Sequence, residues 1–172
     1  PYLYISTSFH LGWRSSTTAD VPIWKIDAET GEIVWPRSYS CYSVEDLSGG
    51  VHGSIVSGKN NVSDLIFVPV ARHPTAGGGT LVALDKATGE EVWAFETQVY
   101  SWCTPTVFYD QNGDGYILYC TAGQYLYLLD ARTMEILDSK NLGGTIEATP
   151  AVYGNYAVVG TRSGTIYGIT LT

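Results

Sequence analysis

Short stretches of apolar and β-branched residues, separated by turns rich in Gly, Asn and Asp, run along the whole chain. A representative series predicts strands over Thr106–Tyr109, Tyr116–Thr121, Tyr125–Leu129 and Glu135–Ser139. β-branched and aromatic residues fill these stretches, as they do in half-buried strands. No segment shows the 3.6-residue apolar period of an amphipathic helix. The sequence therefore predicts an all-β fold built from short antiparallel strands.

Two sequence patterns recur in phase with one another. The longer pattern runs Ile23–Trp35, Leu81–Trp93, more weakly Leu126–Asp138, and in part Thr165–Thr170. Its anchoring aspartates, Asp27, Asp85 and Asp130, are spaced by 58 and 45 residues, and Thr170 holds the fourth place 40 residues further on. The shorter pattern matches Cys103–Val107 with Ala148–Val152, and His52–Ile55 is a degenerate earlier copy.

This period indicates a β-propeller, because a repeat of about 40–45 residues with four short strands is one propeller blade. The blades are predicted at residues 1–40, 41–98, 99–142 and 143–172 of a single propeller segment. The first blade lacks its innermost strand and the last its outermost, which leaves 14 strands. We expect an arc of a larger propeller, its C-terminal half, with the extra residues of the second blade inserted at Arg72–Gly79.

The longer pattern resembles the tryptophan docking motif of the quinoprotein-type propellers, the pyrroloquinoline-quinone-like (PQQ-like) repeat family. The matching residues are Ala83, Asp85, Thr88, Gly89 and Trp93 in one copy and Asp27, Thr30, Gly31 and Trp35 in another. The third copy keeps Asp130 and Thr133 but has Met134 for the Gly and Asp138 for the Trp. The resemblance implies an eight-bladed complete protein. Asp and Thr-Gly suit a tight turn and Trp suits burial between blades, so we expect structural roles.

The segment from Asp110 to Gly115 is the clearest motif outside the repeat. Side-chain oxygens at Asp110, Asn112 and Asp114, followed by Gly, match the first half of a calcium loop. An EF-hand is excluded because the twelfth position is Thr121 and the context is a hairpin. The loop resembles the calcium loops inserted in integrin-type propellers. A polar hairpin turn is the alternative, because Asn-Gly and Asp-Gly favour such turns.

The cysteines bear on cofactor binding. The chain has only Cys41, Cys103 and Cys120. Quinoprotein alcohol dehydrogenases hold PQQ against a disulfide between adjacent cysteines, a pair that is missing here, so no PQQ site is expected in this chain alone. An enzyme is disfavoured, although a PQQ-dependent dehydrogenase with its cofactor in other blades stays the alternative. Cys103 and Cys120 flank a predicted hairpin and are expected to face one another as small buried residues.

One candidate binding surface follows from the repeat. His52, Trp102 and Glu147 stand near the starts of the innermost strands, at the mouth of the central channel. An exposed Trp beside an acidic residue suits a ligand or partner contact, whether protein or carbohydrate. The alternative is that Trp102 plugs the channel.

Composition narrows the class of partner. The 172 residues include 9 basic and 17 acidic side chains, giving a net charge of −8, which excludes a typical nucleic-acid binder. The longest apolar run, Leu65–Ala71, is too short to span a bilayer. We expect a non-catalytic binding or scaffolding module of a secreted, cell-surface or periplasmic protein, with calcium as the candidate cofactor. Self-association through the open blade edges is also expected.

Overall fold

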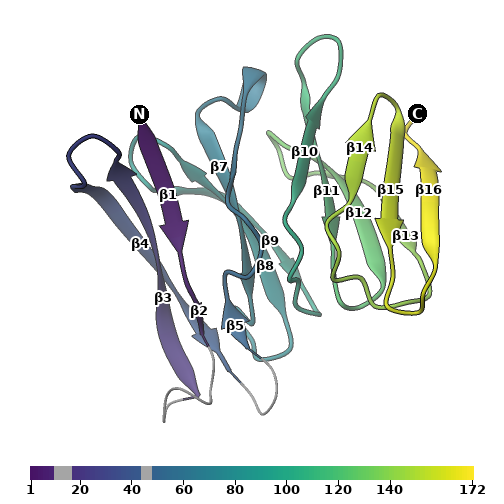
Figure 1. Ribbon diagram of the computed structural model, residues 1–172, viewed down its shortest axis with the longest axis horizontal. Helices are drawn as coiled ribbons and strands as arrows, with labels where there is room; N and C mark the ends of the chain where they lie inside the picture. Colours follow the sequence, from purple (N-terminus) through teal and green to yellow (C-terminus); the bar gives the residue numbers. More distant parts are fainter. Residues whose placement is uncertain (10–16, 44–47) are drawn as a thin grey trace.

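Four antiparallel sheets follow one another along the chain in the computed structural model, which describes residues 1–9, 17–43 and 48–172 (Figure 1). We number them blades 1 to 4 in chain order. Blade 1 holds β1 (Tyr2–Ser6), β3 (Thr18–Asp27) and β4 (Ile33–Tyr42). The N-terminus lies at one end of the series of sheets and the C-terminus at the other.

Blade 3 is a four-stranded meander and shows the repeating unit most simply. It consists of β10 (Thr106–Tyr109), β11 (Gly115–Cys120), β12 (Tyr125–Asp130) and β13 (Ile136–Asn141) in that spatial order. The predicted strand ranges are confirmed to within one or two residues. A register shift at Leu128/Leu129 recurs at the same motif position in blades 1 and 2.

Blades 2 and 4 differ in their strand content. Blade 2 contains β6 (Val56–Ser57), η2 (Asn60–Val62), β7 (Leu65–Ala71), β8 (Gly79–Asp85) and β9 (Glu91–Thr97). Two further short strands, β2 (Ser8–Phe9) and β5 (Gly49–Gly50), join its sheet beside the end of β7. Blade 4 has β14 (Ala151–Tyr153), β15 (Tyr156–Gly160) and β16 (Ile166–Thr170).

The strand count and the insertion differ from the sequence-based expectation. The described residues form 16 strands, because the two-residue β2 and β5 join the 14 that were predicted. The extra length of blade 2 is also not confined to Arg72–Gly79. Seven residues, 72–78, connect β7 to β8, against four, 121–124, between β11 and β12. The connection from β4 to β6, residues 43–55, is likewise longer than residues 98–105 between β9 and β10.

The apolar core lies between the sheets in three clusters, one for each pair of consecutive blades. The two outermost sheet faces remain exposed. Leu3 and Ile5 on blade 1 are 52% and 41% exposed, and Tyr156 and Ile166 on blade 4 are 60% and 76% exposed. The described blades thus form an open arc. Within the described residues no helix has the length and apolar character needed to cross a membrane.

Candidate functional site

The docking-motif turns are held by their aspartates. In blade 2, Asp85 Oδ1 accepts hydrogen bonds from the backbone N–H groups of Ala87 and Thr88, both at 2.8 Å. Asp27 and Asp130 make the same pair of bonds in blades 1 and 3. The bond from the Thr88 N–H, as the largest cause, holds the pKa of Asp85 below its ordinary value. These aspartates therefore hold the turns between the strands.

Trp35 joins blade 1 to the turn of blade 2. Its indole Nε1 donates to the carbonyl oxygen of Lys86 at 3.1 Å, and its ring is only 6% exposed. Lys25, which replaces the Ala of the motif, donates from Nζ to the same carbonyl at 2.7 Å. A Cβ on Gly89 would stand 2.7 Å from ring carbons of Trp35. Gly89 is thus required both for its φ of +75° and for the close approach of the indole.

Within the described residues, the hydrogen bond made by Trp35 is not repeated by the motif Trp of blade 2. Trp93 is buried against blade 3, yet its Nε1 has no hydrogen-bond partner in the described part of the chain. Met134 stands where blade 2 has Gly89, with a φ of +67°, and its side chain packs into the same cluster as Trp93. The turn of blade 3 thus carries a side chain at the position where Gly89 leaves room for the ring of Trp35.

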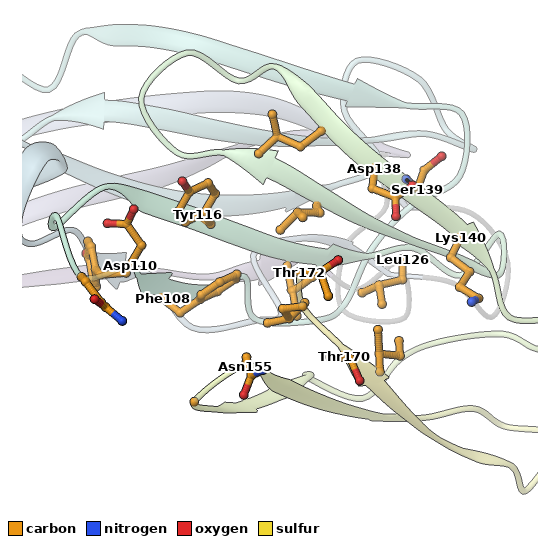
Figure 2. Close-up of a pocket in the computed structure, with 18 residues that line it drawn as sticks. Phe108, Asp110, Tyr116, Leu126, Asp138, Ser139, Lys140, Asn155, Thr170 and Thr172 are labelled. Atoms are coloured by element: carbon orange, nitrogen blue, oxygen red, sulfur yellow. Dashed lines mark hydrogen bonds between the residues drawn. The ribbon is translucent and has the colours of Figure 1, made fainter.

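Asp138, which replaces the third motif Trp, is exposed beside a groove between blades 3 and 4. Figure 2 shows Asp138, Ser139 and Lys140 along β13 on one side, with Thr170 and Thr172 on the other. The groove has a volume of about 1040 Å³, and polar residues line it together with the apolar and aromatic side chains of Phe108, Tyr116, Leu118, Leu126, Leu128, Leu137, Ile169 and Leu171. It lies where the two preceding interfaces hold Trp35 and Trp93. The loss of the motif Trp therefore leaves space between these blades.

The Asp110–Gly115 loop forms the hairpin turn between β10 and β11. Asp110 Oδ1 accepts from the backbone N–H groups of Asn112 and Asp114, both at 2.9 Å. Asp114 Oδ1 accepts from Asn61 Nδ2 of η2 at 3.1 Å. The described residues contain no group of three or more His, Cys, Asp or Glu side chains placed to hold a metal ion. Calcium binding by Asp110, Asn112 and Asp114 stays a prediction.

The starts of the innermost strands are linked from blade to blade. Thr104 Oγ1 accepts from the Ser54 N–H at 2.8 Å, and Thr149 Oγ1 accepts from the Thr104 N–H at 3.1 Å. These bonds make Ser54 equivalent to Thr104. The sequence alignment of the degenerate copy, which pairs Gly53 with Thr104, is therefore wrong by one residue. His52, Trp102 and Glu147, two residues before Ser54, Thr104 and Thr149, are then equivalent positions in blades 2, 3 and 4.

The structure brings His52 and Trp102 together and adds two residues that sequence reasoning missed. Their ring centroids lie 5.3 Å apart, Tyr100 lies 5.0 Å from Trp102, and the Arg72 guanidinium carbon lies 4.2 Å from the Tyr100 ring centroid. We call these four residues the Arg72 row. Glu147 pairs instead with Arg162, whose Nη1 lies 3.4 Å from Glu147 Oε1.

The Arg72 row lies among the loops that follow the second and fourth strands of each blade, at the bottom of Figure 1. We call this side of the arc the lower face. Aligning the residues that follow the second strands could have revealed Arg72 in the sequence. That position is Thr in the other blades, at Thr7, Thr121 and Thr161.

Cys103 and Cys120, which were expected to face one another, are both fully buried free thiols. A hydrogen bond with Cys103, followed by burial, raises the pKa of Cys120. These cysteines therefore lie together in the core, where burial keeps them unreactive.

Comparison with known proteins agrees with this architecture. The chain matches the structure of BamB from Moraxella catarrhalis with a TM-score of 0.63 and 19% identity, over 91% of this chain and 44% of that one. It matches the computationally designed Ika4 protein with a TM-score of 0.63 and 12% identity, over 98% of this chain and 92% of that one. The chain thus spans less than half of the BamB structure. No curated protein matches it.

The family assignment rests on the second half of the chain. Residues 77–172, more than half of the sequence, match the family model described as outer membrane protein assembly factor BamB. These residues contain Trp93 and the turn at Asp85, together with blades 3 and 4. The chain is therefore a β-propeller segment that belongs to the PQQ-like repeat family described by BamB.

Proposed function

We propose that this chain is part of a non-catalytic β-propeller that binds a protein partner through its lower face. The proposal rests on one observation: aromatic and charged side chains that are suited to contacting a partner recur at the same position of the repeat. His52, Trp102 and Glu147 stand there in successive blades, and all three are half-buried. Trp, Tyr and Arg dominate binding energy at protein interfaces, and the Arg72 row contains one of each.

The frame beneath these side chains supports the proposal. Hydrogen bonds through the Thr104 and Thr149 hydroxyls fix the strand starts relative to one another. Loops held on a rigid scaffold are where binding residues gather. The family model is named for a protein of outer membrane assembly. This name supports a location outside the cytoplasm and a role in holding other proteins.

The test compares wild type with one tryptophan variant and one tyrosine variant in a capture assay. The immobilised chain is exposed to periplasmic or secreted protein from its source, and specific partners are identified by mass spectrometry. We expect Trp102→Ala to weaken capture at least about tenfold, as for an interface hot spot. Tyr153→Ala, which changes an aromatic residue 89% exposed at the end of β14 on the opposite side, is the control and should bind normally. Equal capture by wild type and Trp102→Ala would contradict the proposal.

Carbohydrate recognition is the second candidate, because the adjoining rings of Tyr100 and Trp102 provide an aromatic surface. The same variants separate the two functions. A glycan screen in which wild type and Tyr153→Ala bind one sugar class, and Trp102→Ala does not, would assign the surface to carbohydrate.

A further inference from the structure

Arg72 is a buried cation without a counter-ion in the described part of the chain. Its side chain is only 2% exposed. The arginines at positions 37, 132 and 162 each pair with a carboxylate there, whereas no described carboxylate lies within ion-pair distance of Arg72. A guanidinium stays charged at any working pH. An unpaired buried charge is strongly destabilising, so a guanidinium that the described residues leave unpaired calls for an anion from outside them.

The contacts of the guanidinium leave one edge unused. Its Nη1 donates to the carbonyl oxygen of Ala76, and the ring of Tyr100 covers one face. Nε and Nη2 are buried and have no hydrogen-bond partner within the described residues. These two nitrogens form one edge of the planar group, and their N–H bonds are parallel. Such an edge can bind a carboxylate through two hydrogen bonds.

A second donor without a partner belongs to the same row. The indole Nε1 of Trp102 is buried and has no acceptor in the described structure. The ring of Tyr100 lies against both Trp102 and the guanidinium. The Arg72 row thus combines hydrogen-bond donors that have no partner in the described structure with an aromatic surface. This combination suits a carboxylate joined to one or two methylene groups.

The backbone holds Arg72 in place despite an unfavourable conformation. Its φ is +58°, which residues other than Gly rarely adopt. The Tyr42 N–H donates to its carbonyl at 3.0 Å, and its own N–H donates to the carbonyl of Gly78 at 2.8 Å. Blade 2 therefore maintains an Arg where the three other blades have Thr.

We propose that Arg72 binds the carboxylate of an Asp or Glu side chain presented by a protein partner at the lower face. The inference rests on the proposed function, which it deepens by naming the partner's chemistry. A carboxylate fits better than a phosphate, because a phosphate monoester carries about −1.5 to −2 charge and this site offers one cation. Ala76 lies in the loop between β7 and β8, which has exposed residues, so the partner reaches Arg72 by displacing this loop.

The first test follows the Nε–H resonance of Arg72 in the purified chain by nuclear magnetic resonance, in carboxylate-free buffer. The probe is glutamate capped at both its α-amino and α-carboxyl groups. We expect a saturable shift with this probe, a weaker response to inorganic phosphate, and none with equally capped glutamine. The inference would be overturned by equal shifts with the two capped amino acids, or by a stronger response to phosphate.

The second test uses thermal unfolding. Arg72→Met removes the charge and keeps most of the side-chain volume, and Met134 shows that this chain accepts Met at positive φ. Without the probe, the variant should have a Tm at least equal to that of wild type. The probe should raise the Tm of wild type but not of Arg72→Met. Arg162→Met, which breaks the ion pair with Glu147, should still respond to the probe.

A lower Tm of Arg72→Met without the probe would show that the protein already compensates the charge, and would overturn the inference. If that variant does not fold, the titration of the Arg72 Nε–H resonance in wild type still shows whether Arg72 binds a carboxylate. Both tests use the purified chain alone. Their failure is therefore distinguishable from a failure of partner capture through Trp102.

Discussion

The indole of Trp35 packs so closely on Gly89 that a methyl group at Gly89 would stand 2.7 Å from its ring. Gly31 occupies the same motif position in blade 1 with nearly the same φ, +76° against +75°, yet nothing lies within 4 Å of its missing Cβ. The two glycines thus separate the conformational requirement of the turn from the packing requirement of the docked Trp.

Gly89→Ala should therefore destabilise the protein more than Gly31→Ala. Both variants place Ala at positive φ, which costs about 1 kcal/mol. Gly89→Ala also overpacks the indole, which adds about 1–3 kcal/mol. Urea unfolding measures both values. In a Trp35→Ala background the extra cost at Gly89 should disappear, and equal costs in the two original variants would show that Trp35 does not depend on this contact.

Acid should weaken the docking-motif turns. Hydrogen bonds from backbone N–H groups keep the pKa of Asp27 and of Asp85 below the ordinary value of 3.8. The unfolded chain then takes up protons first as pH falls, so the stability from these carboxylates is present above about pH 4 and is lost as pH passes through the lower folded values. We expect Tm to fall below pH 4 less steeply in Asp85→Asn than in wild type. Asp138→Asn, outside these turns, is the control, and identical acid profiles for all three proteins would contradict the argument.

The repeated turns and strands could be predicted from the sequence, whereas the Arg72 row and the groove beside Asp138, which each occur once, could not. The turn at Asp85 and the strands of blade 3 follow from local patterns, because each depends on residues close in sequence. The burial of Trp35 was expected from its place in the repeat, although its partners Lys86 and Gly89 lie in the next blade. The Arg72 row depends on residues 50 positions apart, since His52 meets Trp102 only when consecutive blades pack. The groove beside Asp138 likewise reflects a missing side chain at an interface. The motif shows where the Trp is missing, but the shape of the resulting groove depends on the side chains of the neighbouring blade.

Calcium binding by the Asp110–Gly115 loop can be tested independently of partner binding. If the loop holds calcium, millimolar calcium should raise the Tm by a few degrees, because a ligand that binds only the folded state stabilises it. Asp114→Ala should abolish the shift. Asp114 is a better test than Asp110, whose Oδ1 also accepts two hydrogen bonds that hold the turn. Asp138→Ala should retain the shift, and an unchanged wild-type Tm in calcium would leave the loop as a polar turn.

The exposed end faces should make the isolated chain associate head to tail. The outer face of blade 4 is equivalent to the faces that blades 1 to 3 turn toward the next blade, and the outer face of blade 1 to those turned toward the preceding one. Ile166 and Leu3 are exposed on these two faces. A contact between unlike faces propagates into open chains or closed rings. Sedimentation velocity should therefore show species that grow with concentration.

Charge placed on either face should stop this growth, and a mixture of variants reveals its direction. Leu3→Lys spoils only the blade 1 face and Ile166→Lys only the blade 4 face, so each variant alone should be monomeric. An equimolar mixture should form dimers and nothing larger, because the two intact faces meet once and both outer faces are then charged. Val92→Lys, at a site 50% exposed on the outer strand of blade 2, should associate like wild type. Dimers formed by either variant alone would point to pairing of like faces instead.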